Sequence, residues 1–169
     1  GKTVPNAVLT PLSASGTVCF YVYGQADIIV DINGNFESEL GYSPIAPNRI
    51  ADTRSVMGGI AARPIGNTAG TGAPLEVSVV GTAGIPLSGV TAVSLNVTAI
   101  GISTASSGGY LTVYPCDTRP NASNLNFVAG QTVPNAVIAP VSSRGTVCFY
   151  VYGIADIIVD ANGYISNIT

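Results

Sequence analysis

The sequence predicts an all-β protein, an antiparallel β-sandwich of the jelly-roll or Greek-key kind with about eight strands in each repeat of about 129 residues. Three observations carry this prediction. Short segments alternate between apolar and polar residues, Gly- and Pro-containing turns separate them at intervals of roughly 8 to 15 residues, and no long segment has the helical period. The repeat itself is inferred from a segment that occurs twice in the chain, as expected of a repeat protein.

The two copies are residues 1–36 and 130–165, which align without a gap and are identical at 26 of 36 positions. We therefore expect residues 1–40 to be the C-terminal part of a preceding or swapped repeat module. Residues 41–169 should form one complete β-sandwich module. A segment such as 1–40 cannot bury its apolar side chains alone, so we expect it to be bound to another module.

Within the first copy, residues 3–11 contain two prolines, so any strand there is short or lies at an edge. Residues 17–23 alternate strictly and give the strongest strand signal of the chain. A second strand is expected at residues 27–32, ending at the Asn-Gly dipeptide 33–34, which favours a turn.

A polar, proline-containing stretch, residues 37–48, is interpreted as the junction between the two modules, with the boundary near Gly41. A compact charged run, 48–54, comes next. Residues 55–74 are rich in Gly, Ala and Pro and predict a long surface loop. Four strands are expected next, followed by the second copy of the opening segment: 75–80, 92–100, 110–114 and 123–128. The polar face of residues 92–100 (Ser94, Asn96 and Thr98) should point outward.

The composition argues against several classes of function. Charged residues make up only 9% of the chain, against about 25% in a typical protein. The six basic residues form no run, so nucleic acid is not an expected partner. The longest apolar runs, such as 28–30 and 157–159, are far shorter than the ~20 residues of a membrane-spanning helix.

No catalytic constellation is recognisable in the sequence. Histidine is absent, so no serine nucleophile has a histidine base. No carboxylate pair stands in an acid/base context, and no Gly-rich loop has the setting of a phosphate cradle. We expect the protein not to be an enzyme and to use no cofactor.

The repeat suggests how the three cysteines pair. Cys19 and Cys148 occupy equivalent positions, so the natural pair within the module is Cys116 with Cys148, and Cys19 is left unpaired or bonded to another module. The Cys116–Cys148 bond would stabilise the module by about 3 to 4 kcal/mol on the chain-entropy estimate. It would also indicate an oxidising, extracytoplasmic compartment. Three free thiols in a reducing compartment are the alternative.

Two groups of charged residues could bind ligands. The repeated carboxylates are Asp27 and Asp31 in the first copy and Asp156 and Asp160 in the second. They could contribute to a Ca²⁺ site. Capping of turns at strand ends is the more ordinary role, and we predict no metal site. Arg49, Asp52 and Arg54 could bind an anionic ligand. In a chain so poor in charge, an internal Arg–Asp pair that fixes the N-terminal segment of the module is the favoured interpretation.

Four tyrosines form a possible ligand surface: Tyr110, Tyr114, Tyr150 and Tyr152. Aromatic rings with a polar tip can stack on sugars. The same rings can equally stack across neighbouring strands and cover the outer face of the sheet, which is the interpretation we favour.

Several motifs resemble a known repeated module. They are RIADTR (49–54), VSLNVTA (93–99), GYLTVYPCDTRPNASNLNF (109–127), GQTVPNAV (130–137) and ADIIVDANGY (155–164). They are similar to the all-β modules of about 130 residues, often in tandem, found in secreted and cell-surface proteins of high-GC Gram-positive bacteria. The resemblance implies an extracellular accessory module and no catalytic residues. Departures such as Ile50-Ala51 and Ile165 concern local packing.

From these observations we predict a non-catalytic extracellular structural module of a tandem-repeat or self-assembling surface protein: a fibre, sheath or spacer. Its partners would be other copies of the same module, and residues 1–40 would complete a neighbouring module by strand addition. The alternative is an accessory module that binds glycans or cell-wall polysaccharide.

Overall fold

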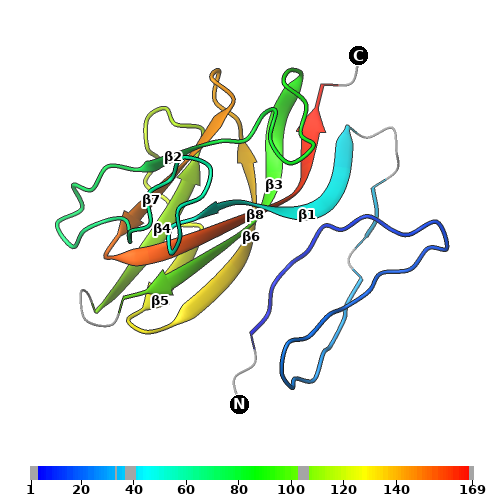
Figure 1. The fold of residues 1–169 in the computed structure, drawn as a ribbon, viewed down its shortest axis with the longest axis horizontal. Coiled ribbons are helices and arrows are strands. Elements are labelled where there is room, and N and C mark those ends of the chain that lie inside the picture. Colours follow the sequence, from blue (N-terminus) through cyan, green and yellow to red (C-terminus); the bar gives the residue numbers. More distant parts are fainter. Residues whose placement is uncertain (1–3, 33, 37–40, 103–106, 168–169) are drawn as a thin grey trace.

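The fold was analysed in a computed structural model, which describes residues 4–32, 34–36, 41–102 and 107–167. Two four-stranded antiparallel sheets pack face to face, with no helix among the described residues, so the predicted β-sandwich is confirmed (Figure 1). The eight strands are β1 (Tyr42–Asp52), β2 (Leu75–Ser78), β3 (Val90–Gly101), β4 (Gly108–Tyr114), β5 (Leu125–Val128), β6 (Thr132–Pro140), β7 (Thr146–Tyr152) and β8 (Ala155–Ser166).

The last three strands hold both sheets together. The strand orders are β1-β8-β3-β6 and β2-β7-β4-β5. β8 therefore lies between β1 and β3, β7 lies between β2 and β4, and β6 forms an edge. Apart from the ladder between β4 and β5, every ladder between named strands includes β6, β7 or β8. The second copy of the repeated segment thus supplies one interior strand of each sheet, β8 and β7, and the edge strand β6.

The core lies between the two sheets and is built from alternate residues of each strand. On β3 the inward side chains are Val93, Leu95, Val97 and Ala99, all fully buried. Opposite them, β7 contributes Val147, Phe149 and Val151. Phe149 is the largest fully buried residue of the module, so the strongest alternation in the sequence corresponds to the strand that anchors the core.

Most of the predicted strands of the module are confirmed. The ends of β2 to β5 lie within two residues of the predicted positions, and the loop predicted at 55–74 has only isolated bridges. The proline-containing strand β6 is at a sheet edge, as expected for residues that cannot donate to a ladder. The outward face of β3 is less exposed than predicted, because Ser94 is buried and Asn96 and Thr98 are half-buried.

The interpretation of residues 41–48 as a junction is wrong, because they begin strand β1. Residues 37–40 of the predicted junction lie outside the described residues. β1 is an edge strand that pairs with β8, and its register shifts between Pro44 and Asn48 and again between Arg49 and Ala51. These irregularities accommodate the prolines at an edge but break the alternation on which strand prediction depends.

The Asn-Gly dipeptide of the second copy, Asn162-Gly163, is not a turn but lies inside β8. Asn162 falls at a register shift against both neighbouring strands, so it forms a β-bulge. The Tyr42 ring packs over Gly163, and a Cβ at position 163 would lie 2.6 and 2.7 Å from two of its ring carbons. Glycine is therefore required at position 163 by the close approach of this ring.

The first copy does not form the strands predicted for it. Among described residues 4–32 and 34–36, no residue belongs to a strand, and only a turn near residues 14–16 is regular. Thr3 and Asn33 of the predicted elements lie outside the described residues. The same sequence forms β6, β7 and β8 in the second copy, where it pairs with β1 to β5. Strand propensity alone is insufficient here, because the first copy has no partner strands.

The two copies of the glycine provide a matched test. Gly163→Ala should lower the free energy of unfolding by about 1–3 kcal/mol, because the added methyl group has no room beside Tyr42. Gly34→Ala, at the equivalent position of the first copy, meets no atom within 4 Å and should change it by less than about 0.5 kcal/mol. Urea unfolding of both variants measures the difference, and equal effects would contradict the assigned packing.

Candidate functional site

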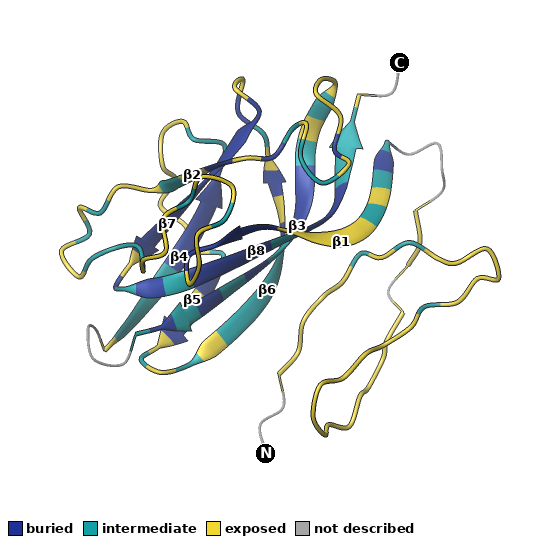
Figure 2. Cartoon of the chain, viewed as in Figure 1, coloured by how far each residue is buried: buried dark blue, intermediate teal, exposed yellow. Residues whose placement is uncertain are grey.

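The most unusual feature of the molecule is its N-terminal arm, which we define as residues 4–32 and 34–36. The arm runs apart from the sandwich and is almost entirely exposed (Figure 2). Phe20, Val22, Ile28 and Val30 are 39–59% exposed. Their copies, Phe149, Val151, Ile157 and Val159, are at most 1% exposed in the core. The same residues thus occur in one chain both as core and as uncovered apolar surface.

Among the described residues, few contacts connect the arm with the sandwich. The Asn6 side chain accepts a hydrogen bond from the backbone N–H of Ala136 on edge strand β6, with an N–O distance of 3.0 Å. It also donates to the Asn96 side chain at 3.0 Å. At the other end of the arm, the ring centroids of Phe36 and Tyr42 lie 4.9 Å apart. These contacts touch the arm near its ends and leave its apolar middle part uncovered.

The predicted disulfide between Cys116 and Cys148 is confirmed, with a Cα–Cα distance of 4.8 Å. It lies on the outer face of the second sheet. Cys19, the copy of Cys148, is a free and exposed thiol. The repeat therefore correctly predicted the pairing within the module. The arm carries a free thiol, Cys19, at the position equivalent to Cys148.

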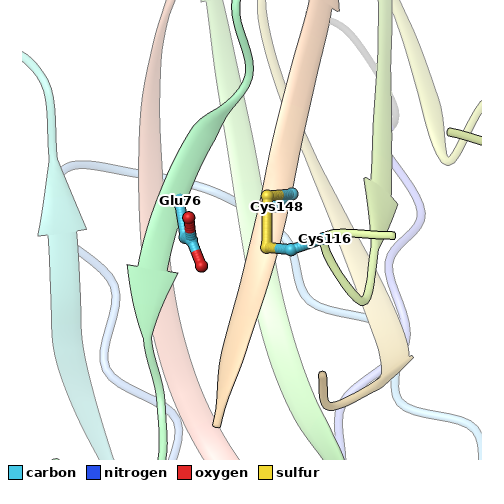
Figure 3. Close-up of side chains that lie close together, drawn as sticks. All are labelled: Glu76, Cys116 and Cys148. Carbon is cyan, nitrogen blue, oxygen red and sulfur yellow. A yellow bond between two sulfur atoms is a disulfide. The ribbon is translucent and has the colours of Figure 1, made fainter. Parts of the chain in front are cut away.

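A potential metal-ligand cluster next to the disulfide is explained by other contacts. Glu76 lies beside Cys116 and Cys148, with ligand atoms of the three residues within 4.8 Å of one another (Figure 3). The two sulfur atoms are bonded to each other, so they are not available as thiolates. The Glu76 carboxylate accepts hydrogen bonds from the Arg144 guanidinium at 2.8 Å and from the Thr146 hydroxyl at 2.7 Å.

The charged run near residue 50 forms an internal ion-pair network, as the favoured interpretation predicted. Arg49 on β1 donates to Asp160 on β8 at 2.9 Å. Arg54 donates to Asp52 through its side chain at 2.7 Å and through its backbone N–H at 3.0 Å. Asp52 is buried, and Arg49 also approaches it at 3.4 Å. The network fixes edge strand β1 against β8.

Asp156 and Asp160 have a different role from the turn capping that we favoured for the repeated carboxylates. Both lie within β8 rather than at turns. Asp156 accepts a hydrogen bond from the Thr53 hydroxyl at 2.8 Å, and the same hydroxyl accepts one from the Ile157 N–H at 2.9 Å. Thr53 was not singled out from the sequence. Its position next to Asp52 in the ADT tripeptide was the available signal.

The four tyrosines lie together on the outer face of the second sheet. Tyr110 stacks on Tyr152, with ring centroids 5.4 Å apart, and the Tyr110 and Tyr150 centroids are 6.2 Å apart. Tyr114 and Tyr150 are buried, together with Cys148. The tyrosines therefore cover the sheet, as in the interpretation that we favoured, and form a small second core.

Loop residues cover part of this tyrosine cluster. Tyr150 donates its hydroxyl to the backbone carbonyl of Gly70 at 2.9 Å, and the Arg119 guanidinium lies 3.7 Å above its ring centroid. Arg119 was not identified from the sequence, because no periodicity links a loop residue to a strand. Of the four rings proposed as a sugar-binding surface, only those of Tyr110 and Tyr152 remain accessible.

Comparisons with known proteins add nothing to these contacts. The chain matches no protein-family model, no curated protein and no solved structure. The described residues contain no helix of sufficient length and apolarity to cross a membrane. The resemblance to tandem bacterial surface modules therefore stays a prediction.

The Asp52 network predicts a loss of stability in acid. Hydrogen bonds from the Arg54 guanidinium lower the pKa of Asp52 from 3.8 to about 2. A lowered folded-state pKa contributes stability above pH 4, and this contribution is lost as the pH falls towards 2. Since Arg49 and Arg54 are 40% and 47% exposed, we expect the contribution to be about 1–2 kcal/mol.

Urea unfolding between pH 7 and pH 2 tests this expectation. Asp52→Asn should be less stable than the wild type at pH 7 and should lose less stability between pH 4 and pH 2. Asp117→Asn, at an exposed position, is the control and should follow the wild-type curve. The same acid dependence in Asp52→Asn and in the wild type would show that Asp52 does not carry this effect.

Proposed function

We propose that this protein is a non-catalytic, extracellular structural module of a tandem-repeat or self-assembling surface protein. In this proposal residues 1–40 complete a neighbouring module by strand addition. The observation that carries it is the contrast between the two copies. The arm exposes apolar side chains whose equivalents are fully buried in the module. Exposed surface of this kind typically marks an interaction site.

The position of the second copy in the sandwich indicates what the arm would complete. Without β6, β7 and β8, the first sheet has a gap between β1 and β3, and the second has one between β2 and β4. An acceptor of the β1–β5 type would need three strands with this sequence. Such strands would supply both the main-chain hydrogen bonds and the apolar side chains of the core.

The arm also carries the groups that hold the second copy in place. Asp27 and Asp31 are the equivalents of Asp156 and Asp160. Asp156 binds Thr53, directly after β1, and Asp160 binds Arg49 on β1. Cys19 is the equivalent of Cys148 and would bond to the acceptor's equivalent of Cys116. A covalent link between modules suits an extracellular, oxidising environment, where disulfides persist.

The number of segments in the chain favours a partner outside residues 41–169. These 169 residues contain one segment that forms β1 to β5 but two copies of the segment that completes it. One copy is therefore always in excess, whichever of the two occupies the core. A neighbouring repeat or subunit with an incomplete core would accept the excess copy.

A matched pair of substitutions tests the separate roles of the copies. Phe149→Ala should lower the free energy of unfolding by about 3–5 kcal/mol, because it leaves a cavity in the core. Phe20→Ala should leave the stability of the module within about 0.5 kcal/mol, because Phe20 contacts no core. Thermal or urea unfolding of the purified chain measures both.

Association is tested with the intact chain by light scattering and by binding of an apolar fluorescent dye. The wild type should associate as its concentration rises and should bind the dye, whereas Phe20→Asp should weaken both properties. Asn35→Asp adds the same charge at another exposed position of the arm and serves as the control. A stable wild-type monomer with no dye-binding surface would exclude assembly through the arm.

A further inference from the structure

The two copies differ in a way that bears on which module the arm can enter. They differ at 10 of 36 positions, since 26 are identical. Eight of these positions are exposed or half-buried in the second copy, where a change costs little. The other two are Ala139 and Ala161, which are 1% and 0% exposed. The arm has Thr10 and Ile32 at these positions.

Ile32 does not fit the core of its own chain. Its equivalent, Ala161, lies on β8 opposite Leu95 on β3, and both residues are fully buried. Isoleucine has three more carbon atoms than alanine. Protein interiors are close-packed, so this extra volume would displace Leu95 or distort β8. The site that receives Ile32 must therefore be larger than the one that holds Ala161.

Thr10 presents a related problem at the edge of the same sheet. Its equivalent, Ala139, pairs with Val93 on β3, and both residues are buried. Threonine would place a hydroxyl group among apolar side chains, and a buried hydroxyl without a hydrogen-bond partner is destabilising. The acceptor of the arm should offer a polar partner at this position.

We infer that the arm is built to be rejected by the core of its own chain and to fit an acceptor module with different core residues. This inference rests on the proposed function and names the partner more narrowly. The acceptor is a β1–β5 half-module that has a smaller side chain than leucine opposite Ile32 and a polar group within reach of Thr10. The mismatch keeps the arm from displacing residues 130–166 and leaves it available to this neighbour.

Cys19 can report whether the arm enters its own core. In Cys148→Ser, Cys19 and Cys116 are both thiols, and they come together only when the arm replaces β6 to β8. The chain is unfolded and refolded in a mixture of reduced and oxidised glutathione. The two thiols then form one disulfide while one glutathione disulfide is reduced to two thiols, so atoms and electrons balance. Peptide mapping measures the Cys19–Cys116 bond in monomers and in oligomers.

The decisive comparison removes the mismatch from the arm. Cys148→Ser alone should form little of the Cys19–Cys116 bond. Adding Ile32→Ala and Thr10→Ala, which copy the residues of the second segment, should raise its yield at least about fivefold, the lower limit for relief of overpacking. Adding Ala14→Ser instead, which copies the second segment at an exposed position, should leave the yield unchanged.

Two further variants distinguish the possible failures. Adding Phe20→Asp to the Ile32→Ala/Thr10→Ala variant should abolish the bond, because a carboxylate at the core position of Phe149 prevents docking. A bond that persisted in this variant would come from random pairing of the thiols. Adding Ala161→Ile to the Ile32→Ala/Thr10→Ala variant instead destabilises the second copy in the core and should raise the yield of the Cys19–Cys116 bond further. Equal high yields with and without Ile32 and Thr10 would overturn the inference but leave strand addition standing. No bond even with Ala161→Ile would overturn both.

Discussion

The fold depends on the pairing of β7 and β8 with strands on both of their sides. β7 joins β2 to β4, and β8 joins β1 to β3, so neither sheet is continuous without them. The core has the same dependence, because Phe149, Ile157 and Val159 from these strands fill the space between the sheets. The disulfide and the network around Asp52 reinforce the same strands: Cys148 lies on β7, and Arg49 binds Asp160 on β8.

The sequence was sufficient to predict most of the segments that can become strands, with β1 as the exception, but not whether they do. In the module, alternation located β2 to β5 because alternate residues of these strands face the core between the sheets. The arm shows the limit of this reasoning. Residues 17–23 have the clearest alternation and yet form no strand, because partner strands are missing. Propensity is local, whereas the hydrogen bonds of a strand always come from elsewhere.

Some contacts of the candidate site could likewise be predicted from the sequence, and others could not. The Cys116–Cys148 bond could be predicted because the repeat makes Cys19 and Cys148 equivalent. An internal Arg–Asp pair was predicted because the chain has few charges, but Asp160 could not be identified as the partner of Arg49. The roles of Thr53 and Arg119 depend on residues more than thirty positions away, Asp156 and Tyr150, which no local pattern connects to them. Sequence periodicity has no information about such contacts.

The register of β1 against β8 determines how the module would respond to mechanical load. Tyr42 at the start of β1 pairs with Ile165 near the end of β8, so the points at which the chain enters and leaves the module are neighbours. Tension along a series of such modules would open this antiparallel ladder from one end, breaking its hydrogen bonds in succession instead of shearing them all at once. The module would therefore unfold at low force and lengthen. The Cys116–Cys148 disulfide, with a sequence separation of 32, would limit this extension, because the segment that it closes cannot be pulled straight.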